Sequence, residues 1–336
     1  MVDFLVKRLS QALITLFALS IVLFAWLRSL PGGPVSALVG ENASVEERQE
    51  MERILGLQDP LIVQYWRFLT RAVQGQFGKS TGVQSGQDSM SLFLERFPAT
   101  LELGFVALII ALLIGIPLGY IAAKRSGSLL DTGSIMVSLV GVAVPVFFLA
   151  FLLKYIFAIK LGVLPVSGRQ SVGIDSTTIT GFVVLDGVMT REWDAVLDGL
   201  KHLVLPAIAL SSIPMAVIFR ITRASVISVM DEDYVRTAEA KGLTPRVIRG
   251  RHVLRNGLIP VITVTGLQVG VLLGGAVLTE KVFTFRGVGH ALAQGFETRD
   301  YAVLQVLILM SALVYIVVNL IVDMAYGAID PRARVS

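Results

Sequence analysis

The chain alternates between long uncharged apolar runs and polar connections. Six of the runs reach, or nearly reach, the roughly 20 predominantly apolar residues that a helix needs to cross a bilayer. They are Leu9–Leu27, Leu103–Ala123, Thr132–Leu153, Leu203–Phe219, Gly257–Thr279 and Tyr301–Val322. The fourth run is the shortest and contains Pro206 and Pro214, which predict a kink or a tilt there. The pattern therefore predicts an all-α membrane protein with six transmembrane helices.

The density of lysine and arginine predicts the orientation of these spans. If the N-terminus lies inside, the inner segments are 1–8, 124–131, 220–256 and 323–336, and they hold 14 basic residues. The outer segments are about twice as long in total and hold a similar number, so density favours both termini in the cytoplasm. The first run is predicted to be retained as a helix, because it is longer than the usual core of a secretory signal and no small-x-small cleavage site follows Leu30.

Two long polar connections fall on the outer side in this orientation. In the first, residues 31–100, a helix is predicted over Glu46–Leu57, and a second helical pattern has apolar residues every four positions at Leu61, Tyr65, Leu69 and Val73. That second helix is expected to lie at the membrane interface or on the span bundle; a contact surface for a substrate-delivery protein is the alternative. The second connection, residues 160–202, is either a gate or a partner surface.

Composition agrees with a membrane protein and removes several function classes. Of the 336 residues, 54% are hydrophobic and only 16% are charged, whereas soluble domains carry roughly 25% charged residues. The chain has no cysteine, which excludes disulfides and thiolate metal sites. The net charge of +4 comes from basic residues beside the apolar runs, so it does not indicate nucleic-acid binding.

Candidate chemistry within the chain is sparse. The segment Gly75-Gln-Phe-Gly78-Lys79-Ser80 resembles a phosphate-binding loop, but Val73 stands where that pattern needs its first glycine. The three histidines are scattered along the chain, at His202, His252 and His290. Neither a metal site nor a catalytic triad is predicted, and we expect a protein that is not an enzyme and binds no cofactor itself.

The polar segment 220–256, between the fourth and fifth runs, is the most informative part of the chain. It carries eight basic and four acidic residues. Residues 234–241 lack helix breakers, Gly242 is typical of a helix C-cap, and Pro245 is typical of a helix start. The segment therefore predicts a helix, a sharp turn and a second helix that form a short rigid knob. Small residues at Thr237, Ala238 and Gly242 would let a partner approach closely; an ordinary positively charged cytoplasmic loop is the alternative.

The motifs of this segment and of the flanking chain resemble a known family. The segment reads Asp233-Tyr-Val-Arg-Thr-Ala-Glu-Ala-Lys-Gly242 and then His252-Val-Leu-Arg-Asn-Gly-Leu-Ile-Pro260. Further matching segments are Leu30-Pro-Gly-Gly-Pro-Val35, Leu55-Gly-Leu-Gln-Asp-Pro60, Pro98-Ala-Thr-Leu-Glu-Leu103, Gly274-Gly-Ala-Val-Leu-Thr-Glu280, Arg299-Asp-Tyr301 and Asp330-Pro-Arg-Ala-Arg334. Together they are similar to the inner-membrane permeases of binding-protein-dependent ABC importers, in the branch that imports dipeptides, oligopeptides and, in some members, nickel or glutathione.

One departure from the general permease signature agrees with that branch. The signature begins with Glu-Ala-Ala, and its key glycine follows six residues after the Glu. Counted back from Gly242, these positions hold Arg236, Thr237 and Ala238, a sequence that is common in the peptide-importing branch. The stretch Leu164-Pro-Val-Ser-Gly-Arg169 is similar to the dipeptide permeases in particular.

The resemblance implies a fold and a set of partners. The fold is the type I ABC importer permease fold, with residues 1–30 as the N-terminal tail and first span, 31–100 as an extracytoplasmic loop region, and 101–336 as the core permease domain. The implied partners, besides the lipid bilayer, are a second homologous permease, two ABC ATPase subunits that hold ATP and Mg²⁺, and an extracytoplasmic substrate-binding protein. ATP-driven closure of the ATPase pair would shift the knobs and switch the spans between inward-facing and outward-facing states. The expected ATPase-coupling interface is Asp233, Tyr234, Arg236, Thr237, Ala238, Lys241, Gly242, Arg246, His252 and Arg255.

Glu102, Gln268 and Glu280 are the candidates for the pathway or its gate. Glu102 is also explained as a carboxylate at a helix start, and Glu280 with Lys281 as an outer salt bridge or a rim contact. Lys154 is expected to extend to the outer interface. Glycines at four-residue spacing favour close helix packing; they are Gly266, Gly270, Gly274 and Gly275.

A secondary transporter or channel that is not coupled to ATP is the main alternative function. It would need charged residues in the middle of its spans or inverted repeats, and the six runs indicate neither. An integral membrane enzyme would need a catalytic cluster near the interface. The resemblance favours dipeptides as the cargo and longer peptides next. Selectivity in such systems resides largely in the binding protein, which is a separate chain.

Overall fold

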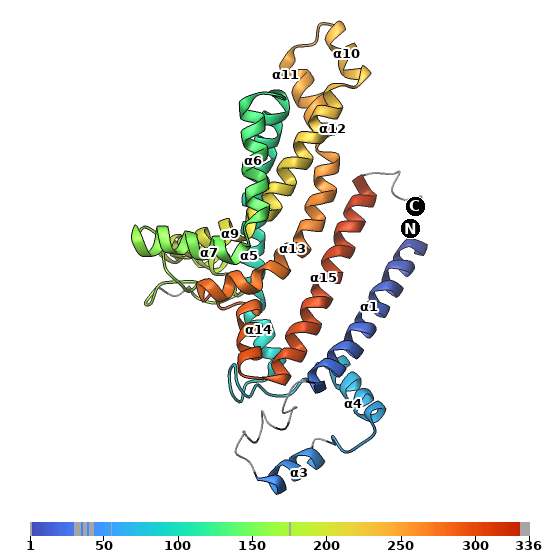
Figure 1. Ribbon diagram of the computed structural model, residues 1–336, viewed down its shortest axis with the longest axis vertical. Coiled ribbons are helices and arrows are strands. Elements are labelled where there is room, and N and C mark those ends of the chain that lie inside the picture. The colour runs from blue at the N-terminus through green and yellow to red at the C-terminus, as the bar shows by residue number, and fades with distance from the viewer. Residues whose placement is uncertain are drawn as a thin grey trace. The chain divides into compact units, whose positions relative to one another are not determined.

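The computed structural model describes residues 2–29, 35, 39, 44–54, 56–174 and 176–329. Within these ranges the regular structure is helical, apart from an isolated β-bridge between Lys79 and Asp88 (Figure 1). The elements are α1 (Val2–Ser29), α3 (Val45–Ile54), α4 (Leu61–Val73), α5 (Ser89–Lys124), α6 (Leu129–Ala143), α7 (Val146–Leu153), η1 (Lys154–Lys160), α8 (Val183–Thr190), α9 (Trp193–Met230), α10 (Asp233–Ala240), α11 (Pro245–Val247), η2 (Ile248–Leu254), α12 (Arg255–Gly257), α13 (Ile259–Phe283), α14 (Val288–Glu297) and α15 (Tyr301–Ile329).

Five of the described helices are long and apolar enough to cross a membrane, and one bent pair adds a sixth candidate span. The five span segments are Val6–Ser29, Ser89–Lys124, Trp193–Met230, Ile259–Phe283 and Tyr301–Val322. Each overlaps a predicted apolar run, and with the bent pair counted as one span the predicted all-α fold of six spans is confirmed. α9 continues as a helix through both Pro206 and Pro214.

The third predicted run, 132–153, is not one continuous helix. It is divided between α6 and α7, which are bent by 101° at a short break, so that α7 runs across the direction of α6 (Figure 1). Val144 is extended there (φ −78, ψ 122), and Pro145 caps α7. The residue before a proline is pushed out of the helical region, and proline has no N–H to continue the helix. The prediction of an unbroken third span was therefore wrong, although Pro145 lies within the run.

By their contacts the residues form two compact units, to which α5 and α15 both contribute. The first unit is Met1–Pro98 with Arg286–Leu320, and the second is Ala99–Phe285 with Ile321–Ser336. The predicted boundary between a loop region and a core domain near residue 100 stays a prediction.

The first unit has an apolar core between α5, α14 and α15. Its buried residues are Leu92, Phe93, Val288, Ala291, Val303, Val306 and Leu307. A second cluster in this unit packs Leu23 and Leu27 of α1 against Tyr301 and Leu304 of α15. α4 also packs on α1, where the rings of Phe24 and Tyr65 meet edge to face with centroids 5.3 Å apart. Of the residues predicted at four-residue spacing, Tyr65 therefore packs on α1, whereas Leu61 and Val73 are exposed.

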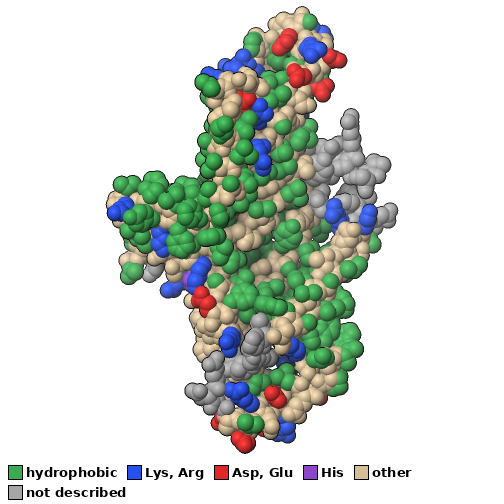
Figure 2. Space-filling view, viewed as in Figure 1, with side chains coloured by type: hydrophobic (Ala, Val, Ile, Leu, Met, Phe, Trp, Pro, Cys, Tyr) green, Lys and Arg blue, Asp and Glu red, His purple; other side chains and the backbone are tan. Residues whose placement is uncertain are grey.

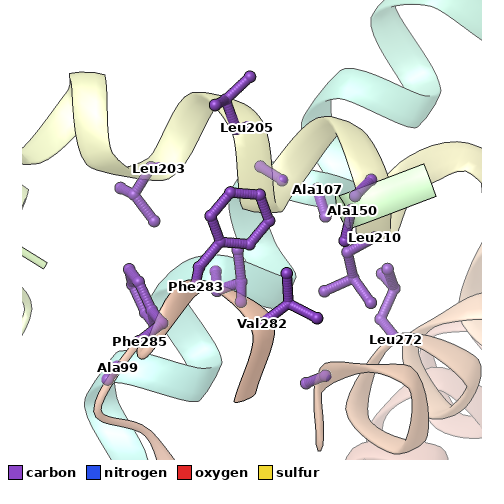
Figure 3. Packing of buried hydrophobic residues seen from close by; sticks show 14 of the residues in the cluster. Ala99, Ala107, Ala150, Leu203, Leu205, Leu210, Leu272, Val282, Phe283 and Phe285 are labelled. Carbon is purple, nitrogen blue, oxygen red and sulfur yellow. The ribbon is translucent and has the colours of Figure 1, made fainter. Parts of the chain in front are cut away.

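The second unit is built around α9. Its largest core cluster joins α5, α9 and the end of α13, and Phe283 lies in the middle of the side chains drawn in Figure 3. The most apolar window of α9 is 72% buried, whereas the windows of the four other long helices are 17–28% buried. Those helices keep much of their apolar surface exposed (Figure 2), which suits contact with lipid or with another membrane subunit.

Candidate functional site

The segment between α9 and α13 folds as a helix, a sharp turn and further helical turns. α10 ends at Ala240, and Gly242 follows with a φ of +72, in the left-handed region that glycine adopts at little cost. Thr244 is extended and Pro245 occupies the first turn of α11. The helix–turn–helix prediction for this segment is confirmed. The π-helical turn η2 that follows was not predicted.

This segment has a small apolar core of its own. Val235 and Ala238 of α10 pack with Ile248 and Val253 of η2, and the same cluster includes Ala123 of α5 and Val226 of α9. Ala238 is only 5% exposed, so its small side chain serves packing inside the segment. The idea that Ala238 is open to a partner protein is therefore wrong. The core is continuous with α5 and α9, so α10 is packed onto two long helices.

Most of the other predicted coupling residues lie on the outside of this segment. The exposed ones are Asp233, Tyr234, Arg236, Thr237, Lys241, Gly242, Arg246 and Arg255, and His252 is half-buried. Charged side chains gather at this end of the molecule (Figure 2). We call the exposed residues together with His252 the coupling surface.

Asn256, which the sequence did not single out, connects the two halves of the segment. Its Nδ2 group donates to the hydroxyl of Tyr234 at 3.0 Å and to the carbonyl of His252 at 3.0 Å. The bond to Tyr234 links α12 to α10 across 22 residues. In the sequence, Asn256 stood out only as part of the family motif His252–Pro260. That motif does not indicate which residue Asn256 contacts.

A buried ion pair fixes α6 to α9 in the same unit. Nε of Arg223 donates to Oδ1 of Asp131 at 2.5 Å, and Nη2 donates to Oδ2 at 2.7 Å. The side chain of Asp131 is 3% exposed. This two-point contact holds both groups in one geometry. The pair is 92 residues apart in sequence, which is why the sequence did not reveal it.

Glu102 binds the start of a helix, but not the helix to which it belongs. α5 begins at Ser89, so the prediction that Glu102 lies at the start of its own helix was wrong. Its Oε1 accepts from the N–H of Val184 at 2.9 Å, and Oε2 accepts from Nη2 of Arg169 at 2.9 Å. Val184 is in the first turn of α8, where unpaired N–H groups favour a carboxylate. Glu102 therefore holds both α8 and the connection around Arg169 against α5.

Glu280 and Lys154 also differ from their predicted environments. The side chain of Glu280 is fully buried, and its Oε1 accepts a 2.6 Å hydrogen bond from the hydroxyl of Thr100. The rim contact offered for Glu280 is therefore wrong. Nζ of Lys154 donates to the carbonyl of Val282 at 2.7 Å, near the end of α13, instead of extending away from the protein.

Gln268 lies apart from the other two pathway candidates. It is on α13, 12 residues before Glu280, or about 18 Å along the helix axis. Its side chain is 8% exposed, and its Oε1 has no hydrogen-bond partner among the described residues. Glu280 is bonded to Thr100, which lies two residues before Glu102 on α5. No hydrogen bond joins Gln268 to either glutamate among the described residues.

The glycines of α13 differ in what surrounds them. A Cβ on Gly266 would collide with Val322 of α15, and a Cβ on Gly275 would come within 3.1 Å of Leu210. A Cβ on Gly274 would meet nothing within 4 Å. Close packing is therefore confirmed at Gly266 and Gly275. At position 274 the described chain offers no packing reason for a glycine.

Two family models match nearly the whole chain. Residues 115–335 match the binding-protein-dependent transport system inner membrane component, and residues 1–104 match the N-terminal part of the membrane component of such systems. The chain belongs to this family. It is therefore a multi-pass inner-membrane permease subunit of an ABC importer, as the motifs indicated.

Individual relatives align over their full length. The permease is 44% identical over 336 residues to the di/tripeptide transport system permease protein DppB of Pseudomonas aeruginosa, with 99% of each chain covered. It is 40% identical to the dipeptide transport system permease protein DppB of Escherichia coli K12, and 36% identical to the glutathione transport system permease protein GsiC of the same strain, again with 99% of each chain covered.

Proposed function

We propose that this permease carries dipeptides or short peptides across the bacterial cytoplasmic membrane. The similarity to permeases named for di- and tripeptide transport supports this cargo, because it extends over 99% of both chains. The relative named for glutathione is less similar, at 36% identity. Glutathione is itself a short peptide, so the cargo class is the same for both kinds of relative.

The proposed driving force enters through the coupling surface. An ABC ATPase subunit would bind the exposed face of α10 and α11, and a second homologous permease would present its own segment to a second ATPase. ATP and Mg²⁺ would be held by those ATPase subunits and not by this chain. The observation that carries this proposal is the internal core of Val235, Ala238, Ile248 and Val253, which is packed onto α9 through Val226. ATPase closure would thus be converted into a rigid-body movement of the spans.

We place both termini in the cytoplasm, with the coupling surface on the same side. The excess of arginine and lysine in residues 220–256 supports this orientation. The connection that carries Arg169 and α8 would then face outward, where an extracytoplasmic binding protein delivers the cargo. The contacts of Glu102 with Arg169 and Val184 would hold this outer connection closed against α5, in the role of a gate.

Gln268 is the proposed contact within the pathway. Its Oε1 is a buried acceptor without a partner in the described chain, and such groups are rare unless they serve a ligand or a water. A peptide backbone offers N–H donors to an acceptor of this kind. Glu280 would have a supporting role, since its carboxylate is already bonded to Thr100.

The coupling proposal is tested by purifying a tagged Thr237→Trp variant and identifying the subunits that co-purify with it. Thr237 is exposed on α10, and its hydroxyl bonds only the carbonyl of Asp233, four residues earlier. The tagged wild-type chain should recover a second permease and ATPase subunits from mild detergent, and Thr237→Trp should recover the second permease with little ATPase. Thr70→Trp is the matched control, because Thr70 is exposed on α4 and makes the same bond to the carbonyl of Trp66.

Transport distinguishes the proposal from its alternative. Dipeptide uptake by cells with the wild-type chain should stop on ATP depletion and should fall in Thr237→Trp but not in Thr70→Trp. A chain that elutes alone and still transports after ATP depletion would instead be a secondary transporter or channel.

A further inference from the structure

A cavity of about 470 Å³ lies in the first unit, beside the C-terminal end of α1. This volume is within the roughly 300–1,000 Å³ that is usual for small-ligand sites. Three arginines and three glutamines line it: Arg28, Arg67, Arg71, Gln64, Gln76 and Gln305. The described lining contains no carboxylate, so its charge is positive.

Arg28 is held in a fixed position, and its Nη groups remain available as hydrogen-bond donors. Its guanidinium lies over the ring of Phe24, 3.6 Å from the centroid, and its Nε donates to Oε1 of Gln64 at 3.0 Å. Gln64 is buried, and its own amide donates to the carbonyls of Leu57 and Asp59. Among the described residues, the Nη groups of Arg28 have no hydrogen-bond acceptor. A guanidinium with one edge fixed and one edge available is suited to a planar or tetrahedral oxyanion.

The other two arginines come from one face of α4. Gln64, Arg67 and Arg71 stand at positions i, i+3 and i+7, which share a face of a helix. Arg67 is paired with Asp59, and the neighbouring Gly56 leaves room for its guanidinium, since a Cβ there would collide with Nη1. Arg71 is exposed and has no ion-pair partner in the described chain. The cavity therefore presents two arginines, Arg28 and Arg71, whose charges no carboxylate in the described chain offsets.

Away from the cavity lining, α4 and α1 carry exposed apolar residues, including tryptophan. On α4, Leu61, Ile62 and Trp66 are 67%, 68% and 56% exposed, and Trp26 of α1 is also exposed. Tryptophan is enriched where a membrane meets water, and an amphipathic helix with exposed apolar residues lies in that zone. These residues place α4 in the interfacial zone, where the arginines of the cavity are at the depth of lipid headgroups.

We propose that this cavity binds the headgroup phosphate of an anionic phospholipid, with Arg28 and Arg71 as the main contacts. In the orientation given under Proposed function, on which this statement rests, the lipid belongs to the outer leaflet. The bound lipid ties α4 to the end of the first span. A free oxyanion, such as inorganic phosphate or the carboxylate of a peptide, has the same recognition chemistry but is not held at the interface by acyl chains, as a phospholipid is.

Native mass spectrometry of the purified complex, titrated with phosphatidylglycerol, tests the site. Arg71→Gln and Arg28→Gln should each weaken binding of one phosphatidylglycerol by about tenfold, because each removes a charge-assisted contact of the kind worth at least one decade in affinity. Arg53→Gln is the matched control: Arg53 lies on α3 outside the cavity, is exposed and is paired with Glu50. If Arg28→Gln lowers the yield of folded protein, Arg71→Gln tests the site by itself, because Arg71 has an exposed side chain.

Competition identifies the source of the anion. The lipid proposal expects that neither inorganic phosphate nor a dipeptide at millimolar concentration displaces phosphatidylglycerol, and that zwitterionic phosphatidylcholine binds more weakly. Displacement by phosphate or dipeptide would overturn it in favour of a free oxyanion, and equal lipid binding in all three variants would overturn the site itself. ATP-dependent dipeptide uptake, measured on the same variants, reports separately on the proposed transport function.

Discussion

The hydroxyl of Ser80 donates a 2.6 Å hydrogen bond to Oδ2 of Asp300, across 220 residues of sequence. The same oxygen accepts from the backbone N–H groups of Thr81, Gly82 and Val83 at 3.0, 2.9 and 3.1 Å. Asp300 has no exposed surface. One buried carboxylate therefore organises the whole turn before α5 and fixes it to the start of α15.

Asp300→Ala should strongly destabilise the first unit. It leaves up to five donors without an acceptor, the fifth being the N–H of Val303 on Oδ1, and each buried unsatisfied group costs about 1–3 kcal/mol. We expect a loss of at least about 3 kcal/mol, seen as a lower thermal midpoint of the purified complex. Asp88→Ala is the control, because Asp88 is an exposed carboxylate of the same turn that caps α5 through the N–H of Ser91. Its loss should cost only about 1 kcal/mol, and equal effects of the two substitutions would contradict this view of Asp300.

Glu102 and Arg169 should show strong energetic coupling in a double-mutant cycle. Their side chains are 8% and 18% exposed, and removal of one partner from a pair buried in this way costs about 3–5 kcal/mol. Glu102→Gln and Arg169→Gln should each lower the thermal midpoint and increase protease cleavage of the connection near residue 170. The double substitution should lower the thermal midpoint by clearly less than the sum of the two single effects, because it leaves no unpaired charge. Additive losses would show that the two residues act independently, and would remove the support for a shared gating role.

The outer connection should loosen in acid. The backbone N–H and hydroxyl of Thr177 donate to the carboxylate of Glu192 and hold the pKa of that carboxyl below its ordinary value of 4.5. For Asp186, burial raises the pKa, but hydrogen bonds from Thr180, Ile179 and Gly181 outweigh it, so the pKa lies below 3.8. A carboxyl with a depressed pKa in the folded state stabilises that state above its unfolded pKa, and the stabilisation is lost as the pH falls through the folded value.

Hydrogen exchange of residues 176–192 checks this pH dependence. Protection, corrected for the intrinsic exchange rate, should be constant above about pH 4.5 and should fall below it. Glu192→Gln should reduce protection at neutral pH and remove part of the acid dependence. An unchanged acid dependence in this variant would exclude Glu192 as one of its causes.

Gly266 and Gly274 should respond differently to the same substitution. Gly266→Ala forces a methyl group into Val322, whereas Gly274→Ala adds one where nothing lies within 4 Å. We expect Gly266→Ala to lower the free energy of unfolding by about 1–3 kcal/mol through overpacking. Gly274→Ala should be neutral or stabilising, since alanine has the higher helix propensity. Thermal midpoints of both variants give the comparison, and a destabilised Gly274→Ala would indicate a neighbour from another subunit.

Most of the architecture and part of the candidate site could be read from local sequence. The six apolar runs predicted the spans, because burying about 20 apolar residues in a bilayer is a property of each segment by itself. Gly242 and Pro245 predicted the turn between α10 and α11, because each restricts its own backbone. Pro145 was also visible, but whether a proline kinks a span or breaks it by 101° depends on what its neighbours then pack against.

The tertiary structure decided which groups meet. Glu102 begins no helix of its own and instead caps α8, 81 and 82 residues away; Ala238 faces inward because Ile248 and Val253 fold over it. The pairs Asp131–Arg223 and Ser80–Asp300 join positions 92 and 220 residues apart. Such contacts leave no periodic or compositional trace, because a carboxylate is the same in sequence whether its partner is water or a distant N–H group. The sequence by itself therefore determined the spans, the turn and the family, and only the folded chain determined where each charge is neutralised.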